Sequence, residues 1–250
     1  GFPGTIVPVN PRQKEVMGLP VFADLADYDG KVDLGIIAVP GPAVVRAVES
    51  LAAKGCKAAV VITAGFKEVG PEGAKLEKEL VARAHSVGVR LVGPNCLGVL
   101  NTHSTLNASF AMRLPPAGGI SVISQSGALL TAIIDLAVGA HLGLSSMVSI
   151  GNKADLNETD FLKVYAEDPD TGVIVGYLED ITDGHEFIKA AEAVTQKKPV
   201  VLLKVGTTQA GKRAASSHTG SLAGADMAYG AAFKRAGVIR VETYEQRFDV

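Results

Sequence analysis

The chain of 250 residues has no tryptophan, two cysteines and no excess of either charge, with 24 Lys+Arg against 26 Asp+Glu. Cys56 and Cys96 are too few to form the disulfide framework of a small secreted domain. A net charge of −2, with no block of like charge, argues against a general binder of nucleic-acid phosphates, because such a protein needs a basic face. Asp135 and His141 interrupt the longest apolar stretch, 129–144, which therefore falls short of the ~20 residues of a membrane span. No basic-then-apolar signal segment opens the chain, so we expect a cytoplasmic location.

The sequence also lacks several motifs that carry chemistry. Its five histidines show neither H-x-x-x-H nor Cys/His spacing, so no metal site is predicted. It has no G-x-G-x-x-G fingerprint and no acid after the second predicted strand, which argues against a nicotinamide-dependent oxidoreductase. The nearest match to the phosphate-binding pattern G-x-x-x-x-G-K-[ST] places Arg213 where a magnesium-binding hydroxyl is needed. Nucleotide hydrolysis by this chain alone is therefore not expected, and Cys96, with no histidine close in sequence, is not interpreted as a nucleophile.

Glycine is abundant instead: 28 of 250 residues, or about 11% against a usual ~7%, which predicts many tight loops. Hydrophobic residues make up 47% and charged residues 20% of the chain, as in a folded globular protein. Short β-branched runs alternate with longer amphipathic segments, a pattern typical of parallel sheets whose strands are buried on both faces. The predicted strands are 5–9, 35–39, 58–63, 89–93, 120–124, 145–150, 172–178, 199–205 and 237–241, and the predicted helices are 42–54, 71–87, 126–140, 158–167, 185–195 and 223–236.

The segment 113–119 has two prolines and two glycines in seven residues, which predicts a linker. The sequence thus predicts an α/β protein of two doubly wound parallel-sheet domains, 1–113 and 119–250. The chain opens on Gly1, and its first residues are typical of the middle of a domain, so we expect a fragment of a longer protein. Doubly wound sheets bind ligands at the carboxyl ends of their strands, and the segments after each strand are therefore the candidate functional loops.

Two of these segments carry candidate chemistry. Ser126 and Gly127 lie where a strand meets a long helix, a place that favours an anion, although an ordinary N-cap explains the same residues. The 19-residue run 206–224 is rich in Gly, Ala, Ser and Thr and contains His218 as its only group that titrates near neutral pH. A strand-end carboxylate such as Glu179 could fix the tautomer of that imidazole and leave its other nitrogen nucleophilic. The alternative for both side chains is a solvated surface position.

Two asparagines, Asn95 and Asn152, occur in further strand-end turns at 93–98 and 149–152. Their amides can donate hydrogen bonds to a carbonyl or a phosphate, and the neighbouring glycines allow a ligand to approach the backbone. The alternative is that both residues only form turns.

Nine motifs follow one another along the chain: VNPR (9–12), GLPVF (18–22), AVP (38–40), ITAGFKE (62–68), GPNCLG (93–98), SQSGAL (124–129), SIGN (149–152), YLED (177–180) and K-x-G-x-T-x-x-G-x-x-A-x-x-S-H-T-G (204–220). In this order they resemble those of the nucleoside-diphosphate-forming acyl-CoA synthetases. This superfamily includes the α subunit of succinyl-CoA synthetase and ADP-forming acetyl-CoA synthetase. The resemblance covers essentially the whole chain, and its most specific part, SSHTGSLAG, is closer to the acetyl-CoA synthetase branch.

The resemblance implies a Rossmann-like CoA-binding domain followed by a flavodoxin-like domain of the succinyl-CoA synthetase type. It also implies an acid–CoA ligase in which acyl-CoA and phosphate give acyl phosphate and CoA. The phosphoryl group then passes to a histidine and from there to ADP or GDP, and every step is reversible. In this scheme His218 is the phosphorylated nucleophile, Glu179 orients it, and Ser126 and Gly127 hold the phosphoryl group.

For CoA, the resemblance implies four contact regions. Asn10, Pro11 and Arg12 are expected to lie along the bound molecule, Val39 and Pro40 against its adenine, Gly65 close to its backbone, and Asn95 and Cys96 near the thioester. Family members open with a strand and a glycine-containing loop that are not visible here, so the first domain is expected to be incomplete at its start.

An ATP-grasp module, which binds the nucleotide and Mg²⁺ in this superfamily, is also not visible in the sequence. We therefore expect a partner β subunit or a fused domain, and an oligomer. The alternative is a CoA-sensing regulatory domain of a protein lysine acetyltransferase, but His218 in an intact SHTG context favours the enzyme. The sequence leaves the acyl group and the choice between ADP and GDP open.

Overall fold

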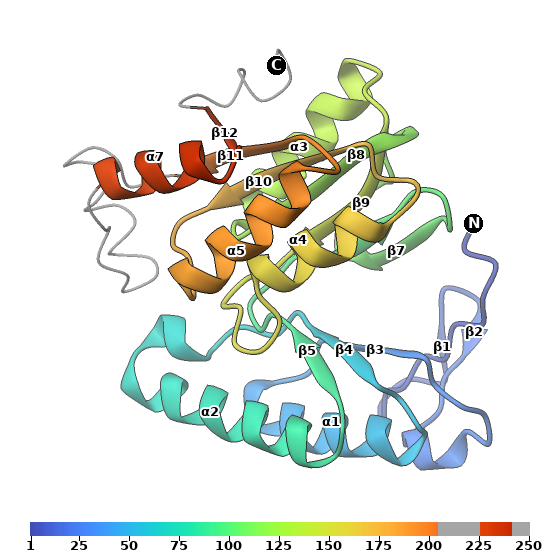
Figure 1. Ribbon diagram of the computed structural model, residues 1–250. Helices are drawn as coiled ribbons and strands as arrows, with labels where there is room; N and C mark the ends of the chain where they lie inside the picture. Colours follow the sequence, from blue (N-terminus) through green and yellow to red (C-terminus); the bar gives the residue numbers. More distant parts are fainter. Residues whose placement is uncertain (205–225, 242–250) are drawn as a thin grey trace.

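The computed structural model describes residues 1–204 and 226–241, which fold into two stacked α/β units (Figure 1). The smaller unit is built on three parallel strands, β3 (Leu34–Ile37), β4 (Ala58–Val61) and β5 (Arg90–Val92), in that order. Helices α1 (Val44–Ala53) and α2 (Pro71–Ser86) lie beneath this sheet in Figure 1. The unit also contains the 3-10 helices η1 (Leu25–Asp27), η2 (Gly41–Ala43) and η3 (Lys67–Val69) and the hairpin strands β1 (Glu15–Val16) and β2 (Leu19–Pro20).

The spacing of apolar residues explains how α1 packs. Val44, Val48 and Leu51 recur at i, i+4 and i+7 and are all buried, so α1 turns one face to the core. Helix α2 begins at Pro71, whose fixed φ suits the first helical turn, and it is followed by Gly88 at φ +73°. The helix predicted at 71–87 is thus confirmed, to within one residue at its end.

The larger unit is built on five parallel strands in the order β12-β11-β10-β8-β9, extended by two antiparallel strands. Counted from β8, this is the flavodoxin order 2-1-3-4-5, whose ligand site lies between the first and third strands. The mixed α/β architecture with two parallel sheets confirms the predicted fold class. The strands are β8 (Ala117–Ser124), β9 (Leu144–Ser149), β10 (Val173–Leu178), β11 (Val200–Lys204) and β12 (Ile239–Val241).

Alternate residues of the central strands point to opposite faces of this sheet. On one face Val122 packs with helix α3 (Gly127–Gly139), and on the other Ile123 packs with the cluster that includes helix α4 (Glu158–Glu167). The second face also carries α5 (Gly184–Thr195) and α7 (Asp226–Arg235). Val60 of β4 and Val92 of β5 belong to the same cluster, which therefore spans both units, while the other buried residues of the small unit form a cluster of their own.

Two strands of the large sheet were not predicted. β6 (Gly98–Asn101) and β7 (Leu106–Ser109) form an antiparallel hairpin, and β6 pairs with β9. Both strands precede the predicted linker at 113–119, yet they belong to the sheet built by the residues after it. A short connection, 102–105, without the Asn-Gly or Asp-Gly signal of a tight hairpin explains why the sequence pattern did not reveal them.

The predicted strand at 5–9 was wrong. The structure has only an isolated bridge between Val9 and Phe22 there. Ile6 and Val9 are exposed and Val7 is only half-buried, so this β-branched run lacks the buried face that stabilises a strand. In the described part of the chain, no helix is both long and apolar enough to cross a membrane.

A loop of the larger unit, 150–156, packs along the end of β5. The backbone N–H groups of Asn152 and Leu156 donate to the carbonyls of Pro94 and Leu91. Gly151 makes this approach possible: its φ is +52°, and a Cβ there would lie 2.4 Å from the carbonyl oxygens of Pro94 and Asn95. The two units are therefore joined by backbone contact at the ends of their strands.

Candidate functional site

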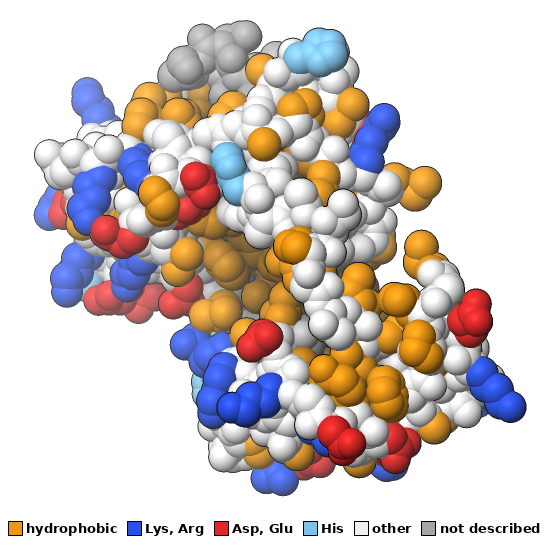
Figure 2. All heavy atoms as spheres, turned by 90° about the vertical axis from the view of Figure 1, so that its right-hand side faces the viewer, with side chains coloured by type: hydrophobic (Ala, Val, Ile, Leu, Met, Phe, Trp, Pro, Cys, Tyr) orange, Lys and Arg blue, Asp and Glu red, His pale blue; other side chains and the backbone are white. Residues whose placement is uncertain are grey.

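A cavity of about 520 Å³ lies between the two units, and the loops that line it follow β4, β5, β8, β9 and β10. On the face seen in Figure 2 the molecule is hollowed between the units, and hydrophobic side chains gather there. Of the candidate residues named from the sequence, the cavity brings together Asn95, Cys96, Ser126, Gly127, Asn152 and Glu179. The other lining residues are Ile62, Ala64, Lys67, Glu68, Leu97, Phe110, Gln125, Ala128, Thr131, Gly151 and Asp180.

Helix α3 begins at the cavity wall. Ser126 is its N-cap, and its Oγ accepts a hydrogen bond from the Leu129 N–H at 3.2 Å. The first N–H groups of a helix have no intrahelical acceptor, and together with the helix dipole they favour an anion. Gly127 keeps this wall open, with the backbone of Leu97 3.5 Å from the position a Cβ would take. An N-cap and an anion site are compatible here. The cap bond occupies the Ser126 hydroxyl and the Leu129 N–H, and the other N–H groups of the first turn can still bind an anion.

Gln125 joins the end of β8 to the end of β10. Its Oε1 accepts hydrogen bonds from the N–H groups of Glu179 at 3.0 Å and Asp180 at 3.3 Å. Its Nε2 donates to Asp180 Oδ1 at 2.7 Å, and its backbone N–H donates to the Tyr177 carbonyl at 2.9 Å. This side chain therefore fixes the backbone of the segment that carries Glu179, at the strand pair where the flavodoxin order places a ligand.

A buried ion-pair cluster supports the same segment from behind. The Lys153 ammonium lies 2.7 Å from Asp180 Oδ1 and 3.0 Å from Glu158 Oε2, and Lys153 and Glu158 are almost fully buried. Burial alone raises the pKa of Asp180, but the Lys153 charge and the hydrogen bonds from Lys153 and Gln125 outweigh it and hold that pKa below its usual value. Asp180 is therefore a carboxylate at neutral pH.

The carbonyl of Glu179 is also held, because it accepts a hydrogen bond from the buried Lys204 Nζ at 2.7 Å. That ammonium lies 4.7 Å from the centre of the Tyr229 ring. Hydrogen bonds thus fix both the backbone N–H and the backbone carbonyl of Glu179, which lines the cavity. His218, its predicted partner, lies outside the described residues, so their pairing stays a prediction.

Asn152, on the large unit, joins the two units at the cavity through its side-chain amide. Its Nδ2 donates to Glu68 Oε2 at 2.6 Å and to Glu77 Oε2 at 2.8 Å, and its Oδ1 accepts from Asn95 Nδ2 at 3.2 Å. Burial favours the neutral form of Glu68, but the Asn152 amide and the N–H groups of Gly65 and Phe66 outweigh it and lower its pKa.

Cys96 lies in the cavity wall as a buried thiol. Burial raises its pKa to about 12, and its Sγ lies 3.3 Å from the Val61 carbonyl oxygen, to which it donates. A thiol with this pKa is neutral at physiological pH, so the structure agrees with the decision not to treat it as a nucleophile.

The other predicted CoA residues lie outside the cavity. Val39 and Pro40 follow β3, and Gly65 follows β4, at the same edge of the small sheet. The Thr63 hydroxyl donates to the Val39 carbonyl at 2.7 Å and ties the two loops together. Gly65 has φ +102° and open space where a Cβ would be, so a ligand can approach its backbone closely. Its N–H is already bonded to Glu68 Oε1 at 2.5 Å and is therefore not available as a donor to that ligand. Asn10, Pro11 and Arg12 form a turn on the N-terminal segment. In this turn Asn10 Oδ1 accepts a hydrogen bond from the Arg12 N–H at 2.9 Å.

Sequence reasoning missed Glu68, Gln125, Lys153 and Asp180 as parts of this site. The first, second and fourth lie inside the quoted motifs, one to three residues from predicted site residues, so the strand-end rule could have included them. Lys153 gives no such signal, because nothing in the sequence distinguishes a buried lysine from a solvated one.

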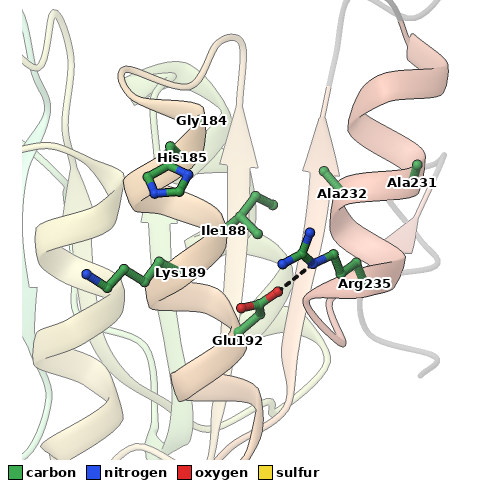
Figure 3. Close-up of a pocket in the computed structure, with 8 residues that line it drawn as sticks. All are labelled: Gly184, His185, Ile188, Lys189, Glu192, Ala231, Ala232 and Arg235. Carbon is green, nitrogen blue, oxygen red and sulfur yellow. Dashed lines mark hydrogen bonds and ion pairs between the residues drawn. The ribbon is translucent and has the colours of Figure 1, made fainter.

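A second hollow, of about 530 Å³, lies between α5 and α7 (Figure 3). Ile188 and Ala232 line it, and the ion pair between Glu192 and Arg235, 2.9 Å long, crosses it. It is formed by two helices rather than by strand ends, and none of the described residues predicted to be functional lines it. The cavity between the units is therefore the better candidate site.

Comparison with known proteins identifies the family of the chain. A family model described as "Succinyl-CoA ligase like flavodoxin domain" matches residues 117–250, and one described as "CoA binding domain" matches residues 3–102. An ADP-forming acetate–CoA ligase of Methanocaldococcus jannaschii is 47% identical over 100% of this chain and 35% of its own length. Subunit alpha of an ADP-forming acetate–CoA ligase II of Pyrococcus furiosus is 44% identical over 97% of this chain and 53% of its own length.

A solved structure gives the same result. The dinucleotide-forming acetyl-coenzyme A synthetase 1 of Ca. Korarchaeum cryptofilum, in complex with phosphate and ADP, superposes with a TM-score of 0.95 at 45% identity. The match covers 100% of this chain and 54% of that chain. The chain thus spans between a third and about half of the relatives it matches. It belongs to the nucleoside-diphosphate-forming acyl-CoA synthetase superfamily, as its motifs predicted.

Proposed function

We propose that the protein is the part of an acid–CoA ligase that binds CoA and carries the phosphohistidine. The observation that carries this proposal is the convergence of the strand-end loops on one cavity. There the start of α3 offers an anion site beside Glu179, and Gln125 joins the two. The relatives are named as ligases, so the regulatory alternative is not favoured.

In the proposed reaction a phosphate oxygen attacks the thioester carbonyl of acyl-CoA, and the CoA thiolate leaves. An imidazole nitrogen of His218 then attacks the phosphorus of the acyl phosphate, and the carboxylate of the acid leaves. Finally an oxygen of the nucleoside diphosphate attacks phosphohistidine and regenerates the imidazole. Ser126 and Gly127, at the start of α3, lower the energy of the anionic phosphoryl group in the first two steps.

Glu179 is proposed to accept a hydrogen bond from the non-reacting nitrogen of His218. This hydrogen bond fixes the tautomer and stabilises the positive charge that develops on the ring. The hydrogen bonds of Gln125 and Lys204 to the Glu179 backbone support this role, because they restrict where its carboxylate can reach.

CoA is proposed to run from the edge of the small sheet to the cavity. Val39, Pro40 and Gly65 would receive its nucleotide end, with Asn10, Pro11 and Arg12 alongside, and Asn95 and Cys96 would lie near the thioester. The exposed Arg12 and the open space at Gly65 fit an anionic ligand that passes close to the backbone. The ATP-grasp module that holds the nucleotide and Mg²⁺ is proposed to belong to another subunit or another part of the polypeptide.

Labelled inorganic phosphate tests this proposal directly. The full-length protein is incubated with acetyl-CoA, Mg²⁺ and labelled phosphate, and acid-labile, base-stable label on the protein is measured. We expect His218→Ala to abolish the label and Glu179→Gln to slow its formation at least about tenfold with the fold intact. His185→Ala and Glu186→Gln, two exposed positions on α5, are the matched controls.

Two outcomes would contradict the assignment. Label that persists in His218→Ala would place the phosphoryl group elsewhere. A wild-type protein that binds acetyl-CoA but takes up no label would favour a regulatory domain.

A further inference from the structure

Four residues that line the cavity offer it apolar groups, and we name them the apolar wall: Leu97, Phe110, Ala128 and Thr131. The Phe110 N–H donates to the Leu97 carbonyl at 3.3 Å, which places the two side by side. Ala128 and Thr131 are three residues apart on α3 and therefore share one face of the helix. The wall thus combines the end of the β6–β7 hairpin with the first turns of α3.

The apolar wall begins at the proposed phosphoryl site. Leu97 Cβ lies 3.4 Å from the position of a Cβ at Gly127, and the Thr131 hydroxyl donates to the Gly127 carbonyl at 3.2 Å. Because that hydroxyl bonds to the helix backbone, Thr131 can offer the cavity its methyl group. A carboxyl group joined to phosphate at Gly127 would therefore have its carbon chain next to this wall.

The apolar wall has two large side chains, and of these Phe110 is exposed to solvent whereas Leu97 is buried. Phe110 is 64% exposed although it lines the cavity. Covering an exposed aromatic ring with an apolar chain removes hydrophobic surface from water on both sides. Phe110 is thus suited to gain burial when a ligand binds.

The charges of the cavity argue against a second carboxylate on the ligand. Among the described lining residues, Lys67 is the one Lys or Arg, and its ammonium already bonds to the Asn152 carbonyl at 2.5 Å. Glu68 and Asp180 are carboxylates with lowered pKa values, held there by hydrogen bonds and by the Lys153 charge. A second carboxylate on the acyl chain would meet the charges of Glu68 and Asp180, with Lys67 as the one cation among the described lining residues to offset them.

We propose that the apolar wall is the subsite for the acyl chain and that Phe110 and Thr131 determine which chains are used. Phe110 covers uncharged, apolar chains, and Thr131 limits the depth available to them. This inference rests on the proposed function, because it takes the phosphoryl group to lie at the start of α3.

The test is the specificity of the full-length protein for three acyl-CoA probes. kcat/KM is measured for acetyl-CoA, isobutyryl-CoA and succinyl-CoA with phosphate and ADP. We expect Phe110→Ala and Thr131→Leu each to lower the isobutyryl-to-acetyl ratio about tenfold, one by removing the cover and the other by filling the space. In the wild type, succinyl-CoA should be used at least about 100-fold less well than acetyl-CoA.

Met112→Ala is the matched control, since Met112 is two residues from Phe110, 97% exposed and not part of the cavity lining. Its ratio should stay within about twofold of the wild type. Active Phe110→Ala and Thr131→Leu variants with an unchanged ratio would overturn the subsite but leave the proposed function standing. Efficient use of succinyl-CoA would overturn the preference for uncharged chains. A wild type that turns over none of the probes would overturn the proposed function and the subsite together.

Discussion

Gln125 Oε1 lies 3.0 Å from the backbone nitrogen of Glu179, from which it accepts a hydrogen bond. The side chain that follows strand β8 thus sets the position of the residue that follows its neighbour in the sheet, β10. Replacing Gln125 by Leu removes this acceptor and the donor to Asp180. We expect kcat for phosphoryl transfer to fall at least about tenfold while KM for acyl-CoA changes by less than about twofold, because the displaced group acts on the chemical step. Gln196→Leu, an exposed position at the end of α5, is the control for the same chemical change. An unchanged kcat would show that Gln125 does not position Glu179.

Lys153 is expected to be the most sensitive charged position for stability. Lys153→Met leaves the buried Glu158 carboxylate and Asp180 without their cation, and we expect a loss of about 3–5 kcal/mol in the free energy of unfolding. Adding Glu158→Gln should recover part of this loss, because it removes one of the uncompensated charges. Urea unfolding of both variants measures the effect. A loss below about 1 kcal/mol in the single variant would contradict the buried ion-pair cluster.

Gly151→Ala tests the backbone contact between the two units. The new Cβ would lie 2.4 Å from two carbonyl oxygens, so one of the two loops must move. Gly55→Ala is the matched control, since Gly55 also has a positive φ, +79°, but has open space around a Cβ. We expect the control to cost about 1–2 kcal/mol from backbone strain alone and Gly151→Ala to cost at least about 2 kcal/mol more, with loss of activity. Equal costs for the two would show that the contact is not rigid.

Asp155 predicts an acid-sensitive link between the units. Its carboxylate accepts hydrogen bonds from Arg90 Nε at 3.0 Å and the Leu91 N–H at 2.7 Å. Burial raises the pKa of Asp155, but these bonds and the one to His85 outweigh it, so the pKa lies below its usual value. A lowered folded-state pKa gives stability that is present above the unfolded value of about 3.9 and is lost as pH falls through the folded value.

Asp155→Asn should therefore be about 1–2 kcal/mol less stable than the wild type at pH 7, with a difference that shrinks below about pH 4. Urea unfolding at pH 7, 5 and 3.5 measures this. A difference that is the same at all three values would mean that the charge of Asp155 does not contribute.

The sequence predicted the parallel strands and their helices well because these segments are buried on both faces or amphipathic with clear end signals. β8 to β12 and α3 to α5 lie within a few residues of their predicted ranges. The run 5–9 failed for the opposite reason, since its β-branched residues suggest a strand while burial, which decides strand formation, is absent there.

The candidate site was predictable in part. The strand-end rule identified the loops of Asn95, Ser126 and Glu179, and the structure brings these residues to one cavity. It located the loop of Gln125 but gave no role to that side chain or to Lys153, because their roles depend on partners 54 to 55 and 5 to 27 residues away in the sequence. Such pairings follow from the strand order rather than from local spacing.

The β6–β7 hairpin has a practical consequence for dividing the chain. A fragment that starts at the 113–119 linker would lack both strands, and the hydrogen-bonding edge of β9 that now pairs with β6 would be open to solvent. Open edges of this kind pair with strands of other molecules, so such a fragment should self-associate. A fragment that starts before Gly98 keeps the edge covered. Protease cleavage in the linker should accordingly leave the two pieces bound to each other. The N-terminal piece keeps the β6–β7 hairpin, and β6 remains paired with β9 of the C-terminal piece.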